Sequence, residues 1–128
     1  LSGVLGPQLT AAMRTMLETV DVLLTPTTPI TAPLIGQESV QYGTIEESVL
    51  GAMIRCTAPF NATHLPALSV PCGFNRAVLP IGMQIAGRPF DEATVLRVGH
   101  AYEQATSWHK RAPVLVDSRA GGAPGSGR

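Results

Sequence analysis

The stretch LPIGMQIAGRPFDE, residues 79–92, decides the fold of this chain. Within it Ile81, Met83 and Ile85 alternate with smaller or polar residues, which predicts a half-buried β-strand because side chains alternate across a strand. Asp91 at its end predicts the N-cap of a helix. That helix carries apolar residues three and four positions apart, namely Val95, Val98, Tyr102, Ala105 and Trp108. A strand that leads directly into an amphipathic helix indicates an α/β fold.

A second strand is predicted just before this stretch. Leu68–Cys72 is mostly apolar but contains Pro71, which cannot donate a hydrogen bond to a sheet, so we expect this strand at an edge or a bulge. The run from Gly73 to Leu79 then predicts a hairpin that joins the two strands.

The N-terminal part predicts a helix and a third strand. The helix begins near Pro7 and carries an apolar stripe of Leu9, Met13, Met16, Leu17 and Val20. Val22–Leu24 is an unbroken apolar run bounded by prolines, typical of a strand that is buried on both faces in a parallel sheet. Residues Ile30–Gly43 carry few signals and are expected to form a loop.

One more helix is predicted from Thr44–Glu47, which fits a capping box. Its buried face consists of Ile45, Val49, Ala52 and Met53. Pro59 disfavours helical geometry in the residue before it, so we expect this helix to end by Arg55 or Cys56.

The composition indicates one domain and excludes two classes of partner. The chain has 128 residues, 14% charged residues and a formal net charge of zero. We expect residues 1–116 to form the domain and residues 117–128, rich in glycine and alanine, to form a disordered tail. No run of basic residues occurs, so nucleic acid and membranes are not expected as partners.

The sequence also indicates a compartment. No apolar run approaches the ~18 residues needed to cross a bilayer, and no export leader is visible. Cys56 and Cys72 do not form a C-x-x-C pair and are expected to act as small buried hydrophobes. We therefore predict a cytoplasmic protein without a disulfide, a metal or a cofactor.

A search for catalytic residues finds none in this chain. No serine lies in the Gly-x-Ser-x-Gly turn of a nucleophile. Lys110 is the only lysine, and its neighbourhood at the end of a helix indicates an exposed cation rather than a buried base. His64, His100 and His109 have no carboxylate or cysteine at ligand spacing, which argues against a small metal-dependent enzyme.

Three stretches together resemble the C-terminal signature of the amidase-signature family. They are Asp21–Pro29, Thr57–Thr63 with its continuation Leu65–Phe74, and Leu79–Glu92, and the resemblance covers roughly residues 7–113. It implies that residues 1–116 form the C-terminal fragment of the amidase-signature fold, a mixed sheet flanked by helices. It also implies hydrolysis of amide C–N bonds by a serine nucleophile, a second serine in a cis peptide and a lysine base, all in an N-terminal part that this chain lacks.

The resemblance leaves this chain with scaffold and part of a pocket wall. Asn61 is expected in a polar break between helix and strand, as a loop brace or as a substrate contact. Thr27, Thr28, Ile54 and Thr57 are further pocket candidates, because ligands bind near the ends of elements in α/β folds.

One departure from the family concerns backbone geometry. His64 stands where members usually carry glycine, and a positive φ at that position costs histidine more than glycine.

Two partners and one competing function remain open. The partner is either the N-terminal part of the amidase or a second copy, because we expect sheet edges and the face of Ile81, Met83 and Ile85 to remain open to water; a small amide substrate is expected only in the complete enzyme. The competing function is a stand-alone, non-catalytic module that binds a partner, or itself, through exposed sheet edges.

Overall fold

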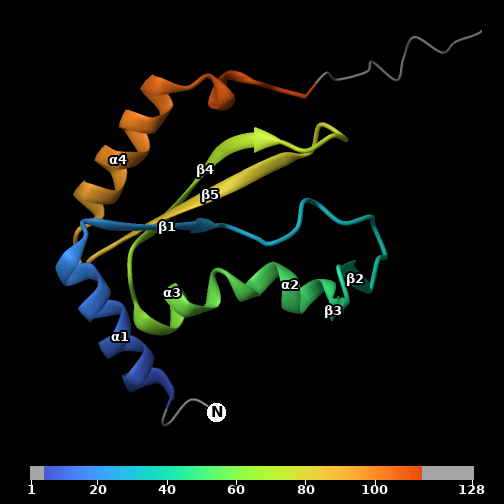
Figure 1. The fold of residues 1–128 in the computed structure, drawn as a ribbon. Helices are drawn as coiled ribbons and strands as arrows, with labels where there is room; N and C mark the ends of the chain where they lie inside the picture. The colour runs from blue at the N-terminus through green and yellow to red at the C-terminus, as the bar shows by residue number, and fades with distance from the viewer. Residues whose placement is uncertain (1–4, 114–128) are drawn as a thin grey trace, which may run out of the picture.

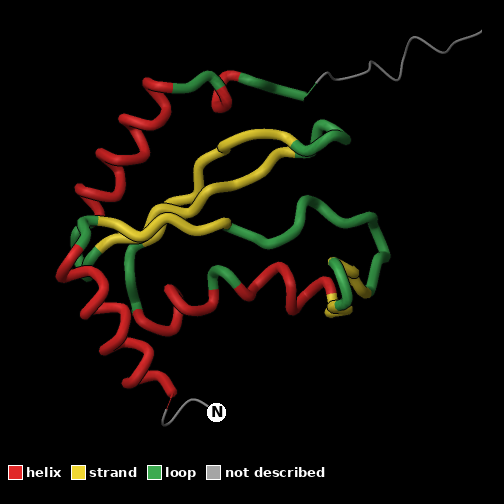
Figure 2. The backbone as a smooth tube through the Cα atoms, viewed as in Figure 1, coloured by secondary structure: helices red, strands yellow, loops and turns green. Residues whose placement is uncertain are grey.

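The computed structural model describes residues 5–113, in which four helices and five strands alternate (Figures 1 and 2). The expected tail, residues 117–128, lies outside the described residues. In chain order the elements are α1 Leu5–Thr19, β1 Val22–Pro26, β2 Ser39–Tyr42, β3 Ile45–Ser48, α2 Val49–Arg55, α3 Ala58–Thr63, β4 Ala67–Phe74, β5 Pro80–Gly87, α4 Glu92–Ala105 and the 3₁₀ turn η1 Trp108–Lys110. The helices at residues 7–20 and after Asp91 are thereby confirmed.

The main sheet is antiparallel, with β5 between β1 and β4. β4 is therefore an edge strand, and its register shifts between Pro71 and Gly73. This confirms the predicted hairpin and the predicted edge or bulge, because Pro71 has no N–H to give to a ladder. β2 and β3 form a separate antiparallel hairpin.

Helices cover both faces of the main sheet. α4 lies on one side in Figure 1, where Val95 packs with Val70 of β4 and Ile85 of β5. Glycines allow this close approach: a Cβ on Gly87 would lie 2.6 Å from Val95, and one on Gly99 would lie 2.5 Å from Leu68. Ile85 is fully buried, so the expectation that its face meets water is wrong at this residue.

The opposite face of the sheet packs against α1 and α3 (Figure 1). Leu17 of α1, Phe60 of α3 and Ala86 of β5 are all buried in this cluster, and Leu65 joins it from the loop that follows α3. The sheet is thus the middle layer of a small three-layer structure, which is a stable arrangement for a sheet with two apolar faces.

The prediction of a parallel strand at Val22–Leu24 is wrong in its direction and in its burial. β1 runs antiparallel to β5 and forms the other edge of the sheet. Val22 packs on the α4 side and Leu23 on the α1 side, whereas Leu24 is 58% exposed. An apolar run therefore arises here because the strand contributes to two separate cores.

The predictions for residues 30–63 need three corrections. The expected loop contains β2, and Thr44–Glu47 form a turn and most of β3 rather than a helix start. The helix begins one turn later, where the Ser48 hydroxyl accepts a hydrogen bond from the Gly51 N–H at 3.1 Å. It ends at Arg55 as predicted, but Pro59 then lies in the first turn of α3, where its missing N–H has no helical partner to lose.

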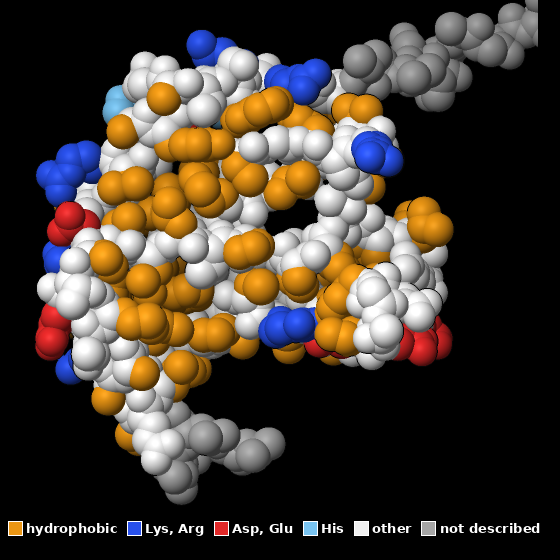
Figure 3. Space-filling view, viewed as in Figure 1, with side chains coloured by type: hydrophobic (Ala, Val, Ile, Leu, Met, Phe, Trp, Pro, Cys, Tyr) orange, Lys and Arg blue, Asp and Glu red, His pale blue; other side chains and the backbone are white. Residues whose placement is uncertain are grey.

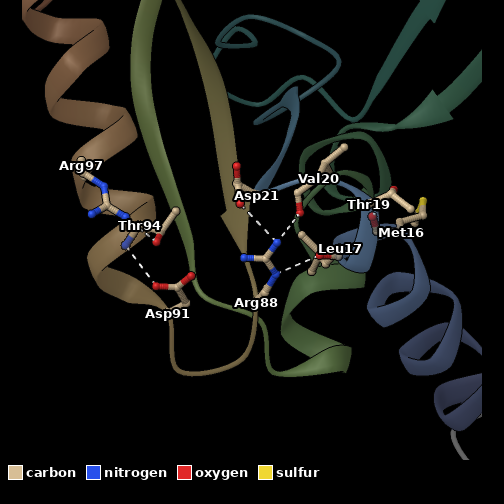
Figure 4. Close-up of polar contacts among 9 residues, drawn as sticks. All are labelled: Met16, Leu17, Thr19, Val20, Asp21, Arg88, Asp91, Thr94 and Arg97. Atoms are coloured by element: carbon tan, nitrogen blue, oxygen red, sulfur yellow. Dashed lines mark hydrogen bonds and ion pairs between the residues drawn. The ribbon is translucent and has the colours of Figure 1, made fainter.

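Polar contacts fix the helix ends that flank β5 (Figure 4). Arg88 donates from Nε to the carbonyl of Leu17 at 2.9 Å and from Nη2 to the carbonyl of Val20 at 3.0 Å. On the other side, the Asp91 carboxylate accepts a hydrogen bond from the Thr94 N–H at 3.3 Å, which confirms Asp91 as the N-cap of α4. The segment after β5 therefore anchors α1 and starts α4.

Apolar side chains also reach the surface. On the face drawn in Figure 3 they form broad patches, with most charged side chains at the periphery. Leu34, Ile35 and Leu50 are among the most exposed. Among residues 5–113, no helix combines the length and the hydropathy needed to cross a membrane.

Candidate functional site

The five candidate residues fall on two segments. Thr27 and Thr28 directly follow β1, and both are partly buried. Ile54, Thr57 and Asn61 lie along the α2–α3 segment, where Ile54 is 51% exposed and Asn61 is also exposed. The site depends on how these two segments are held together.

Gln84 of β5 connects the two segments. Its side chain is 4% exposed, and its amide Nε2 donates to the Thr25 hydroxyl in β1 and to the Cys56 carbonyl at the end of α2, both at 3.1 Å. A buried amide requires such partners, since leaving them unmade costs free energy. One side chain thus fixes the strand that leads to Thr27 against the turn that carries Thr57.

A pair of hydroxyls lies further along the same face of the sheet. The Thr27 Oγ1 and Ser69 Oγ atoms are 2.6 Å apart and hydrogen-bonded, although 42 positions separate them in sequence. Gly82 of β5 lies beneath them, and a Cβ there would come within 2.8 Å of the Thr27 hydroxyl and 3.0 Å of the Ser69 hydroxyl. The Thr27 N–H also donates to the Gly82 carbonyl at 2.9 Å, which fixes the height of Thr27 above the sheet.

The helical half of the site follows the junction of α2 and α3. The Thr57 N–H and hydroxyl both approach the Ile54 carbonyl, at 3.1 Å and 3.2 Å. The Asn61 N–H donates to the Thr57 carbonyl at 3.2 Å. Asn61 therefore lies inside α3, and the prediction that it sits in a polar break and braces a loop is wrong.

The backbone after Asn61 confirms one feature predicted from sequence. His64 ends α3 in the left-handed conformation, with φ 55° and ψ 38°. Its N–H bonds to the Asn61 carbonyl at 3.4 Å. Glycine is the residue that adopts such a conformation at least cost, so histidine imposes local strain here.

The arrangement offers hydrogen bonds rather than bond cleavage. A nucleophilic hydroxyl needs a base within hydrogen-bonding distance, but Ser69 bonds to another hydroxyl. Within residues 5–113, no imidazole or amine contacts the Thr27–Ser69 pair, and no three His, Cys, Asp or Glu side chains gather as metal ligands. Lys110 is exposed in η1, as predicted.

Gln84, Thr25 and Ser69 were missed as site residues. Gln84 carried a signal, because it is the one amide in a strand of otherwise apolar residues and glycines. Ser69 carried none, since its contact with Thr27 depends on the order and register of three strands.

Sequence comparison places these features among known proteins. The family described as Amidase matches residues 5–96. The chain is 50% identical over 97 residues to a component of the glutamyl-tRNA(Gln) amidotransferase of Brevibacillus brevis, which covers 75% of this chain and 19% of that protein. It is 45% identical over 95 residues to the fatty acid amide hydrolase of Medicago truncatula, which covers 74% of this chain and 16% of that protein.

Structural comparison agrees with the sequence. The structure of 6-aminohexanoate cyclic dimer hydrolase superposes with a TM-score of 0.70 and 31% identity, covering 81% of this chain and 23% of that one. The chain thus spans about a fifth of the length of these relatives. The match over residues 5–96 and the shared α/β fold lead to one conclusion: this chain belongs to the amidase family.

Proposed function

We propose that this chain is the C-terminal segment of an amidase that hydrolyses carboxylic amide C–N bonds. In that enzyme the N-terminal part supplies the serine nucleophile, the second serine in its cis peptide and the lysine base. This chain supplies scaffold and one wall of the substrate pocket, and alone it is inactive. The family match supports the reaction class, and the absence of a base beside Ser69 within the described residues supports the division of labour.

The observation that carries the proposal is the bridge made by Gln84. It holds the segment of Thr27 and Thr28 against the segment of Ile54, Thr57 and Asn61. We assign the pocket wall to these five residues and to Ser69. Together they present hydroxyls and a carboxamide beside the exposed side chain of Ile54, a combination suited to an amide with an apolar substituent.

The surface beside this wall suits the N-terminal part of the amidase as a partner. Leu50 is 72% exposed, Met53 44% and Ile54 51%, so α2 presents an apolar side that little of the described chain covers. Leu24 adds 58% exposure at the β1 edge. Burial of apolar surface drives association at ~25 cal/mol per Å², so we expect the isolated chain to self-associate through the same surface. The two free cysteines support a location in the reducing cytoplasm.

A fused enzyme tests the proposal. Residues 5–96 of this chain replace the matching segment of the Medicago truncatula fatty acid amide hydrolase. We expect the fusion to hydrolyse a fatty acid amide, and Ile54→Ala or Thr57→Val to raise KM several-fold with a smaller effect on kcat. Leu96→Ala, on the exposed side of α4, serves as the control. A folded fusion without turnover would favour the stand-alone module instead.

A further inference from the structure

A pocket of about 430 Å³ lies where the β4–β5 hairpin meets the turn after α4. It is remote in sequence from the proposed amidase wall, and its η1 side is formed by residues 108–113, beyond the family match that ends at residue 96. A pocket of this size is within the range that holds small organic molecules.

Two aromatic rings form one side of this pocket. The ring centroids of Phe74, at the end of β4, and Trp108, in η1, are 6.1 Å apart with their planes tilted by 54°. Pro71 and Pro80 extend the apolar lining along the two strands. Such walls favour a flat, apolar ring as the occupant.

The hairpin turn that closes the pocket is held rigidly. The Asn75 carboxamide oxygen accepts the N–H groups of Ala77 and Leu79, both at 2.9 Å. Its Nδ2 donates to the Thr31 hydroxyl at 3.1 Å, which ties the turn to the loop after β1. Between them Val78 lines the pocket at a φ of 61°, a conformation that β-branched residues rarely adopt. Strained residues of this kind are concentrated at functional sites.

The charges at the pocket have one sign. Arg111 and His109 line it, and no aspartate or glutamate does. The Arg111 guanidinium carbon lies 4.8 Å from the centroid of the Phe74 ring, a cation–π contact. Within residues 5–113 the Arg111 side chain has neither an ion pair nor a hydrogen bond, so its N–H donors remain available. A guanidinium matches a carboxylate, which accepts two of its N–H groups.

We propose that this pocket binds an aromatic monocarboxylate, with the ring against Phe74 and Trp108 and the carboxylate on Arg111. The site is independent of the amidase reaction. A neutral ring would leave Arg111 unused, and a compact anion such as phosphate would leave the aromatic wall unused.

The chain contains its own reporter, because Trp108 is the only tryptophan. Benzoate is titrated into the 128-residue chain while tryptophan fluorescence is followed, with a cooperative thermal melt recorded first. We expect a saturable change with half-saturation on the order of 1 mM, and a benzoate-dependent rise in Tm as the second readout. Neutral benzamide, of the same shape, should bind at least tenfold more weakly.

Substitutions assign the charge contact. Arg111→Gln should weaken benzoate binding at least tenfold, whereas Arg97→Gln, on the exposed side of α4, should leave it unchanged. Equal binding of benzamide, equal weakening by both substitutions, or no saturable change in either readout would overturn the proposal. Binding that appears only in a chain ending at Pro113 would also overturn it, by assigning the pocket to the residues that follow.

Discussion

Arg88 and Leu17, 71 positions apart in sequence, are joined by a hydrogen bond of 2.9 Å from the guanidinium Nε to the main-chain carbonyl. Because carbonyls near the C-terminus of a helix lack intrahelical partners, a cation there satisfies them and complements the helix dipole. The same guanidinium approaches Asp21 at 3.3 Å, but that carboxylate is 82% exposed. The carbonyl contacts, not the ion pair, are therefore expected to hold α1 against the sheet.

Arg88→Gln should lower the free energy of unfolding by about 1–2 kcal/mol, because charge-assisted hydrogen bonds to two carbonyls are lost and the site is partly exposed to water. Asp21→Asn should change it by less than about 0.5 kcal/mol. Urea unfolding of both variants measures the difference. If Asp21→Asn proves as damaging as Arg88→Gln, the ion pair rather than the carbonyl contacts anchors the helix.

Gln84→Leu should lower the free energy of unfolding by about 2 kcal/mol, since a buried carbonyl at Cys56 and a hydroxyl at Thr25 then lose their partner. Gln104→Leu makes the same chemical change at an exposed position of α4 and should have little effect. Thermal and urea unfolding provide the comparison. Equal stability of the two variants would mean that Gln84 does not join β1 to α2.

Gly82→Ala should separate the Thr27–Ser69 hydroxyl pair, because the new methyl group would lie within 3.0 Å of both oxygens. We expect a loss of about 1–3 kcal/mol from overpacking. Gly73→Ala is the control in the neighbouring strand, where a Cβ meets no atom within 4 Å. Urea unfolding that shows no difference between the two would contradict the close approach of these strands.

His64→Gly should stabilise the chain by up to about 1 kcal/mol. The left-handed conformation costs a non-glycine residue ~1–2 kcal/mol, and the greater flexibility of unfolded glycine offsets part of the gain. His100→Gly, inside α4, should instead destabilise by about 1 kcal/mol. The sign of the change in Tm decides the matter, and a loss of stability at both positions would argue against strain at His64.

The sequence was sufficient where one local rule decided the geometry. Pro71 placed β4 at an edge with an irregular register, and Asp91 started α4. It misled where two rules applied to the same residues. Thr44–Glu47 fit a capping box, but Glu47 is held by the Tyr42 hydroxyl and by Arg55, contacts that favour a hairpin over a helix start.

The polar site was only partly predictable, because its contacts join distant segments. Thr27 and Thr57 were found from their places at the ends of elements. The Gln84 bridge and the Thr27–Ser69 pair depend on the antiparallel order of β1, β5 and β4, whereas the apolar run at Val22–Leu24 had suggested a parallel sheet.

The rate of amide hydrolysis, measured side by side for the purified 128-residue chain and for its fusion with the Medicago truncatula enzyme, tests the central claim most directly. We expect no turnover above buffer from the chain alone, since no base is paired with a hydroxyl in residues 5–113. The fusion should turn over the amide and lose that activity to a serine-directed inhibitor. Inhibitor-sensitive turnover by the chain alone would contradict the account, because the catalytic residues would then lie within it.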